Sequence, residues 1–376
     1  MTQLRLLAFV PSAHAPTETF VRANLRGLPF ETFAFYGDEF ALCRPLQVAY
    51  ACSVCISKIY YRLGMKRVGT FPPSLVVWIL CQIYRPDVLI AEFGFHAIRM
   101  MEAAAWADIP LVVQFHGSDA FAHKRLTAEL RERYRRLFKV AASVIVKSQP
   151  MRDQLLSLGA SPDRLVVSPC GADPGLFYGA IPGDAPPLFV AVGRFVPKKA
   201  PHLTIRAFAD ACSRVSPSLS RELRLVMVGD GPLLSESRRL VAELNLENQI
   251  SFLGLCNPQE VAELMRSCRA FVQHSMMAPD GDSEGSPVSV AEAQLSGLPV
   301  VSTRHAGIPE VVVEGKSGFL VNEGDVSGMA DFIVRLAEDP DLAASLGRFA
   351  SANALSSFTV QHHIDDIAKV VRRVSL

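Results

Sequence analysis

Short apolar runs recur along the chain, and most of them are followed by a stretch in which apolar residues return at helical spacing. A short apolar run is typical of a strand buried on both faces, and its alternation with helices indicates a parallel sheet covered by helices. The runs form two series on either side of a segment rich in Gly and Pro. The first series comprises 4–10, 30–36, 87–93, 111–116, 142–147 and 165–168, and the second comprises 188–192, 224–229, 250–254, 270–274, 298–302 and 315–321.

The length of 376 residues is more than one hydrophobic core usually supports, so the two series predict two domains. We expect an α/β fold with two doubly wound parallel sheets. The first domain is expected at 1–178, the linker at 179–187 and the second domain at 188–360. In such sheets ligands bind at the carboxyl ends of the strands, so the loops that follow the apolar runs are the places to look for a site.

The two halves of the chain differ in charge. Residues 1–178 carry 20 Lys and Arg against 14 Asp and Glu, whereas the remainder carries 18 against 23. Two predicted helices of the first half, at 53–68 and 126–139, set Lys and Arg opposite an apolar stripe, with Arg133 on the basic side of the second. Such helices either pack their stripe on the core or lie on an anionic membrane surface, and both interpretations stay open.

The sequence contains no run of 18 apolar residues, so we expect no membrane span, and the apolar run at the N-terminus is too short for a signal peptide. Eight cysteines are scattered along the chain, and the CxxC at Cys52 and Cys55 has no second pair with metal-ligand spacing. We expect reduced thiols and a cytoplasmic protein.

The segment 283–310 predicts a loop, a buried helix, a turn and a strand. Ser286 and Pro287 suit the N-cap and the first helical residue, and Gly297 suits a left-handed C-cap. Glu284 lies just before this helix, and Glu292 returns to nearly the same face about 12 Å further along the axis. A helix N-terminus attracts phosphate and a carboxylate suits a diol, so the segment could bind a nucleotide sugar. A solvated helix face would explain the two carboxylates equally well.

Two further places carry candidate site residues. His116 and Asp119 follow an apolar run of the first half, where Asp119 could instead cap the next helix. Arg194 and Lys199 follow the run at 188–192, and Gly193 permits close approach of a ligand. Two fixed cations of this kind suit a diphosphate. Asp280 and Asp282 flank a glycine but lack the remainder of an EF-hand pattern, so we expect no metal there.

The segment from Glu284 to Glu310 resembles the E-x7-E signature of retaining glycosyltransferases of family GT4, which have the GT-B fold, together with their G-x-P-V-V and G-I-P-E continuation. The motifs Gly193–Lys199 and Gly229–Pro232 match the family in the same order, and 169–173 matches more loosely. The resemblance implies two Rossmann-like domains that face a cleft, with the donor on the second and the acceptor on the first. It also implies that the segment 361–376 crosses back to the first domain as a helix.

The resemblance implies a role for each candidate residue. Arg194 and Lys199 would bind the donor diphosphate, Glu292 the ribose and Glu284 the donor sugar, with His116 in contact with the transferred sugar. The donor site would be completed by Gly193, Gly285, Ser286, Pro287 and Val288. The glycine pair that is common in the first loop of the family is missing here, and the acceptor-side candidates are His14, Glu18 and Asp119.

We therefore expect a retaining hexosyltransferase that takes a UDP- or GDP-sugar and acts on a glycan or a polyprenyl-linked oligosaccharide in surface or exopolysaccharide synthesis. By resemblance, the donor's own phosphate takes the acceptor proton, and neither a cofactor nor a metal is expected because protein cations serve the diphosphate. Contact with the inner face of an anionic membrane is a further expectation, and no nucleic acid is expected. A sugar-nucleotide epimerase of the same fold and a non-catalytic polysaccharide-assembly subunit are the alternatives.

Overall fold

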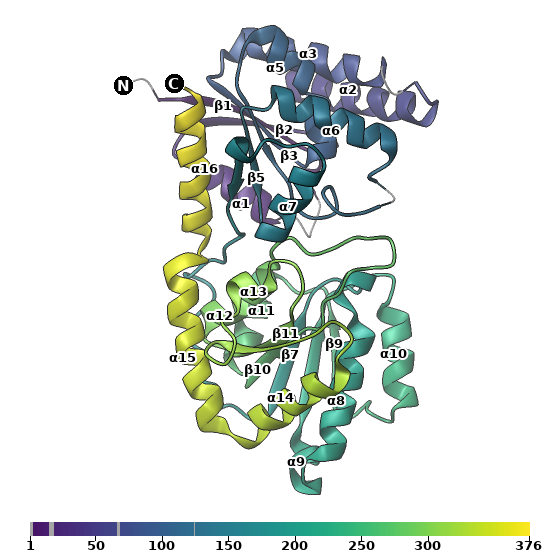
Figure 1. The fold of residues 1–376 in the computed structure, drawn as a ribbon, viewed down its shortest axis with the longest axis vertical. Coiled ribbons are helices and arrows are strands. Elements are labelled where there is room, and N and C mark those ends of the chain that lie inside the picture. Colours follow the sequence, from purple (N-terminus) through teal and green to yellow (C-terminus); the bar gives the residue numbers. More distant parts are fainter. Residues whose placement is uncertain (1–2, 15–18, 66–67, 124) are drawn as a thin grey trace. The chain divides into compact units, whose positions relative to one another are not determined.

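The computed structural model describes residues 3–14, 19–65, 68–123 and 125–376, and the chain divides into two compact units (Figure 1). Unit 1 comprises Met1–Ser168 and His363–Leu376, and unit 2 comprises Pro169–His362. Each unit contains one six-stranded sheet in which every strand pairing is parallel. The predicted α/β fold with two parallel sheets is confirmed.

The sheet of unit 1 has the strand order β2-β1-β3-β4-β5-β6. Its central strands β3 and β4 are buried along their whole length, as the apolar runs predict for strands that are covered on both faces. The strands are β1 (Arg5–Val10), β2 (Glu31–Tyr36), β3 (Val88–Glu92), β4 (Leu111–Gln114), β5 (Ser143–Val146) and β6 (Leu165–Val167).

The helices of unit 1 differ from the expected ones at two places. The helix expected at 53–68 begins earlier, at Pro45, and ends at Arg62. The segment after β3, for which helical spacing predicts a helix at about 95–107, forms two short helices. A third helix, α3, lies beside α2 and was not predicted, because its sequence carries no charge and therefore shows no polar face with a helical period (Figure 1). The helices are α1 (Thr19–Gly27), α2 (Pro45–Arg62), η2 (Val68–Thr70), α3 (Phe71–Tyr84), α4 (Gly94–Ala97), α5 (Met101–Ala107), α6 (Ala128–Val140), α7 (Gln149–Ser157), η3 (Pro162–Arg164) and α16 (Val360–Val374).

The sheet of unit 2 has the strand order β12-β11-β10-β7-β8-β9, so β7 and β10 are its two central strands. Apolar clusters cover both faces of this sheet. The strands are β7 (Leu188–Val192), β8 (Arg224–Val228), β9 (Ile250–Gly254), β10 (Ala270–Val272), β11 (Val300–Thr303) and β12 (Gly318–Val321). The helices are η4 (Pro197–Lys199), α8 (Pro201–Arg214), α9 (Pro217–Glu222), α10 (Leu234–Glu243), α11 (Pro258–Arg266), α12 (Val288–Ser296), α13 (Ile308–Val311), α14 (Val326–Glu338) and α15 (Pro340–Ser357).

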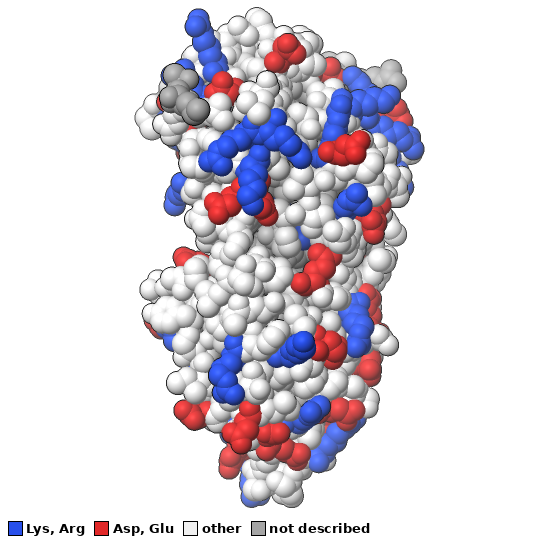
Figure 2. All heavy atoms as spheres, turned by 60° about the vertical axis from the view of Figure 1, so that its left-hand side comes forward, with Lys and Arg blue, Asp and Glu red and all other residues white. Residues whose placement is uncertain are grey.

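The charge difference between the two halves is visible at the surface. On the face drawn in Figure 2, Lys and Arg side chains gather on unit 1, and Asp and Glu side chains gather at one end of unit 2. Within the described ranges, every helix is too short or too polar to cross a lipid bilayer.

Candidate active site

The loop after β7 is held by a glycine turn. Gly229 and Gly231 have φ angles of 135° and 152°, which disfavour any residue with a side chain. A Cβ atom at Gly229 would lie 2.0 Å from the carbonyl oxygen of Gly193, and one at Gly231 would lie 2.6 Å from that of Phe195. The turn after β8 therefore packs directly against the loop that carries Arg194, and it fixes the backbone of that loop.

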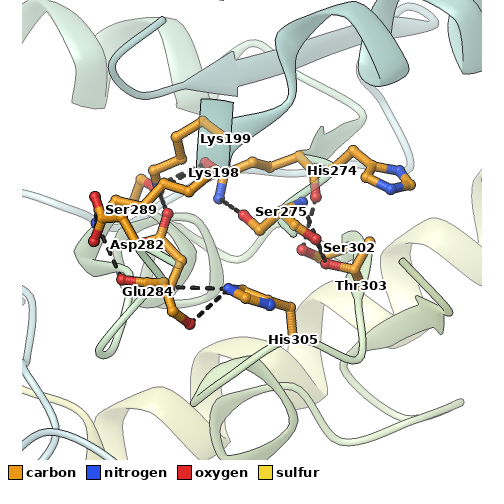
Figure 3. Close-up of polar contacts among 12 residues, drawn as sticks. Lys198, Lys199, His274, Ser275, Asp282, Glu284, Ser289, Ser302, Thr303 and His305 are labelled. Carbon is orange, nitrogen blue, oxygen red and sulfur yellow. Dashed lines mark hydrogen bonds and ion pairs between the residues drawn. The ribbon is translucent and has the colours of Figure 1, made fainter. Parts of the chain in front are cut away.

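Lys199 and Glu284 meet at the end of this loop. The Lys199 ammonium lies 3.1 Å from the Glu284 carboxylate, and both side chains are largely buried (Figure 3). Burial opposes ionisation of Glu284, but the cations of Lys199 and Lys198 outweigh it and lower the pKa of this carboxyl. Two residues that were expected to contact the donor thus converge on one point, and Arg194 and Gly193 line a small cavity with Lys199.

Helix α12 points its N-terminus at this region. It begins at Val288, one residue later than expected, because Pro287 has an extended ψ of 113° and occupies the cap position. Among the residues that the structure describes, no side chain caps this end. The hydroxyl of Ser286 is buried and has no hydrogen-bond partner among the described residues, and Gly285 beside it is buried as well. Uncapped N–H groups beside an unsatisfied hydroxyl are suited to an oxyanion.

Glu292 lies on α12 and is half-buried. Burial raises the pKa of its carboxyl to about 7, although the Lys199 cation acts in the opposite direction. Glu292 is therefore in equilibrium between its protonated and ionised forms near neutral pH. The helix ends at Gly297, whose φ of 99° is the predicted left-handed C-cap.

Two supporting contacts were not predicted. Lys198 is buried, its ammonium lies 3.2 Å from the Asp282 carboxylate, and it donates to the Ser283 carbonyl at 3.1 Å. His305 accepts from the backbone N–H of Glu284 at 3.3 Å (Figure 3). Its other ring nitrogen lies 2.6 Å from the carboxylate of Glu323. Both contacts hold the loop that carries Glu284. No local spacing could reveal them, because each joins residues from separate loops.

In unit 1, His116 follows β4 as expected and makes a defined contact. A ring nitrogen lies 2.6 Å from the carboxylate of Glu92 at the end of β3, and Phe93 packs against the imidazole with ring centroids 4.5 Å apart. Asp119 is fully buried and accepts from the backbone N–H groups of Gly94, His116 and Gly117. These hydrogen bonds fix the conformation of the loop. Contact of Asp119 with an acceptor stays a prediction. His14 is exposed, and Glu18 lies outside the described residues.

Comparison with known proteins identifies the chain. Residues 40–176 match the family described as Glycosyltransferase Family 4, and residues 181–352 match the family described as Glycosyl transferases group 1. A Salmonella typhimurium protein, WcaL, which is named as a colanic acid biosynthesis glycosyltransferase, is 32% identical over 73% of this chain and 68% of its own length. This chain belongs to glycosyltransferase family 4. The expected resemblance is confirmed, and the chain is a glycosyltransferase enzyme.

Two further proteins resemble this glycosyltransferase. AmsK of Erwinia amylovora, named as an amylovoran biosynthesis glycosyltransferase, is 26% identical over 78% of this chain and 71% of its own length. The solved structure of Anabaena HepE in complex with UDP superposes with a TM-score of 0.74 at 20% identity, and covers 98% of this chain and 100% of its own. The second likeness shows that the fold is shared.

A chain of buried polar contacts in the glycosyltransferase leads from the partner of His116 to the C-terminal helix. Gln114 donates to Glu92 at 2.8 Å and accepts from Lys147 at 2.8 Å, and the Lys147 ammonium lies 3.1 Å from His363 of α16. The other ring nitrogen of His363 lies 2.7 Å from the Ser168 hydroxyl. Helix α16 is thereby connected to the strand ends that carry His116.

Proposed function

We propose that this glycosyltransferase moves a hexose from a UDP- or GDP-sugar, with retention of the anomeric configuration, to a glycan or lipid-linked oligosaccharide in surface or exopolysaccharide synthesis. The observation that carries the proposal is the Lys199–Glu284 pair, with 3.1 Å between ammonium and carboxylate, beside the uncapped N-terminus of α12. A cation and helix N–H groups suit a diphosphate, and a carboxylate beside them suits sugar hydroxyls.

The proposed reaction places each charge on a named group. The acceptor hydroxyl oxygen bonds to the anomeric carbon while the bond from that carbon to the diphosphate oxygen breaks. The acceptor attacks from the face that the diphosphate leaves, which gives retention, and the hydroxyl proton passes to a diphosphate oxygen. Negative charge develops on the diphosphate, and Arg194, Lys199 and the N–H groups of Gly285 and Ser286 stabilise it. In this proposal these protein groups take the role that a metal would otherwise have.

The relatives support the nature of the substrates. WcaL and AmsK are named for the synthesis of two polysaccharides, colanic acid and amylovoran, and this supports a polysaccharide pathway. HepE was solved with UDP and with UDP-glucose, and this supports a nucleotide sugar as the donor. Glu292 would bind the ribose hydroxyls of that donor, and Glu284 would bind the hydroxyls of its sugar.

We also propose that unit 1 contacts the inner face of an anionic membrane. Helices α2 and α3 with η2 expose many large apolar side chains, which we call the apolar surface: Ile56, Ile59, Leu63, Val68, Phe71, Leu75, Trp78, Ile79 and Ile83. The basic faces expected on the two helices support this membrane contact only in part. Ile56, Ile59 and Leu63 of the apolar stripe expected at 53–68 are exposed, and Arg133, expected on the basic side of its helix, is buried. The exposed cations Lys58 and Arg62 of α2 accompany the apolar surface.

Thermal denaturation with UDP, GDP, ADP and their common sugar conjugates tests the proposed function. A nucleotide at 100 times its dissociation constant stabilises the folded state by about 2.7 kcal/mol, which is visible as a higher melting temperature. A selective response to UDP or GDP, followed by nucleotide release only when an acceptor glycan is present, is the expected result. Formation of an epimer without acceptor would favour an epimerase, and no response to any nucleotide would favour a non-catalytic subunit.

A further inference from the structure

Unit 1 contains a cavity that none of the proposed donor contacts uses. It has a volume of about 290 Å³, close to the lower end of the range for small-molecule sites. Three arginines from three segments converge on it, namely Arg99 after α4, Arg125 in the loop before α6, and Arg133 on α6. The aromatic rings of Tyr61 and Phe95 form part of the wall, so the cavity combines positive charge with apolar surface.

The arginines of this cavity are held in fixed positions. The guanidinium of Arg125 lies 4.9 Å from the ring centroid of Phe95, and those of Arg99 and Arg133 lie 5.4 Å and 4.9 Å from the ring centroid of Tyr61. Arg99 also donates to the Phe95 carbonyl at 2.9 Å. Stacked guanidinium groups keep their planes oriented, and this lowers the entropy lost when they bind an anion.

The positive charge of the cavity exceeds its negative charge. Arg99 and Arg133 are 8% and 7% exposed. Glu129 pairs with Arg133 at 3.2 Å, but in the described part of the chain no carboxylate forms an ion pair with Arg99 or Arg125. Burying a cation is costly unless an anion compensates it, and this applies to Arg99, because Arg133 is paired and Arg125 is exposed. Three arginines against one glutamate leave about two uncompensated positive charges. The cavity is therefore complementary to a ligand with about two negative charges, such as a phosphate or diphosphate group.

The cavity lies on the same sheet edge as His116. Phe95 packs against Phe93 with ring centroids 5.4 Å apart, and Phe93 packs in turn against the imidazole of His116. Arg125 at the cavity is thus connected to His116 by two aromatic rings. The proposed function assigns the donor diphosphate to Arg194 and Lys199 of unit 2, so the anion in this cavity belongs to another molecule.

The cavity also adjoins the apolar surface, because the ring of Tyr61 at the cavity lies against Gly69 of η2, beside the exposed Val68, and Leu63 directly follows the helix α2 that carries Tyr61. We propose that this cavity binds the phosphate or diphosphate group of a lipid-linked acceptor, with the first part of its lipid on the apolar surface. The inference rests on the proposed function and deepens it, because it assigns the acceptor to a class of phosphorylated lipids and its charged group to three arginines.

Titration of the protein with farnesyl diphosphate and with inorganic pyrophosphate tests this assignment. The wild-type protein should bind farnesyl diphosphate more tightly than pyrophosphate, because only the former has an apolar chain. Arg125→Ala should weaken the binding of both probes about tenfold, since it removes one charge-assisted contact, and Arg125→Glu should weaken it further. Arg135→Ala is the matched control, because Arg135 lies on α6, is exposed and pairs with Glu132.

A second set of variants separates this site from the donor site. The double variant Arg194→Ala/Lys199→Ala should lose its thermal response to nucleotide and keep the binding of farnesyl diphosphate. If that binding disappears in the double variant but persists in Arg125→Ala, the probe occupies the donor site and the inference is wrong. If pyrophosphate and farnesyl diphosphate bind equally tightly, the cavity is a site for free phosphate or pyrophosphate. The assignment of a lipid-linked ligand is then wrong. If nucleotides bind and neither probe does, the inference fails while the proposed function stands.

Discussion

The ammonium of Lys199 lies 3.1 Å from the carboxylate of Glu284, and this contact connects the loop after β7 with the loop before α12. Both side chains are largely buried, so each charge depends on the other for compensation. The pair has a direct consequence for mutagenesis. Removal of one partner changes the charge state of the other, and a loss of activity must be separated from a loss of stability.

Lys199→Ala should lower kcat by about 100- to 1,000-fold, because it removes a cation from the developing charge of the leaving diphosphate. The measurement is nucleotide release with the donor identified by thermal shift. Lys199→Ala/Glu284→Gln removes both charges and should restore the melting temperature without restoring kcat. Turnover of Lys199→Ala within a few-fold of wild type would show that Lys199 does not serve the diphosphate.

Binding of the donor should depend on pH through Glu292, whose carboxyl has a pKa raised to about 7 by burial. The ionised form accepts hydrogen bonds from both ribose hydroxyls, so the nucleotide should bind more weakly as pH falls below about 7, by up to tenfold per pH unit. Because this pKa is raised on folding, protonation of Glu292 itself favours the folded state at acid pH, whereas His274, whose pKa burial lowers to about 4, disfavours it, so the melting temperature is measured at each pH beside the affinity. Isothermal titration calorimetry between pH 5.5 and 8.5 measures how the dissociation constant of the nucleotide changes with pH. Glu292→Gln should remove this pH dependence.

The parts that could be predicted from the sequence are those that depend on neighbours along the chain. The apolar runs predicted the strands, and Gly297 predicted the end of α12. The contacts of Lys198 with Asp282 and of His305 with Glu323 join separate loops, and only the fold brings them together. The burial of Arg133, which lies on the basic side of its helix, could not be predicted, because periodicity shows the composition of a face and not what packs against it.

The contact between Lys198 and Asp282 should stabilise the loop that carries Glu284. Lys198→Met leaves a partly buried carboxylate and the Ser283 carbonyl without their cation, and should lower the free energy of unfolding by about 1–3 kcal/mol. It should also raise the KM for the donor. Asp282→Asn combined with Lys198→Met should be less destabilised than the sum of the single variants, as measured by urea denaturation. Strictly additive effects would show that the two side chains are not coupled.

Glu92 should act on catalysis through His116, because its carboxylate lies 2.6 Å from the imidazole and fixes the ring. Glu92→Gln preserves the shape but loses the charge-assisted hydrogen bond, so kcat should fall about tenfold. The KM for the nucleotide sugar should change much less than kcat, since the proposed contacts with the diphosphate and the ribose lie in unit 2. If Glu92 has a purely structural role, Glu92→Gln should lower the melting temperature and should not lower kcat selectively relative to KM.

The apolar surface should bind anionic vesicles through its side chains as well as through its cations. Leu63 and Ile83 are 68% and 54% exposed, so Leu63→Glu and Ile83→Glu disturb the fold little and place charge where the lipid would lie. The double variant should partition into vesicles at least about tenfold more weakly than wild type, because each side chain contributes roughly 1 kcal/mol when buried. Flotation at low salt measures this, and Leu355→Glu on α15 is the control, since Leu355 is 49% exposed in unit 2. If the wild-type protein does not float with anionic vesicles at low salt, the proposed membrane contact is wrong. If Leu355→Glu weakens partitioning as much as the double variant does, the contact does not lie on the apolar surface.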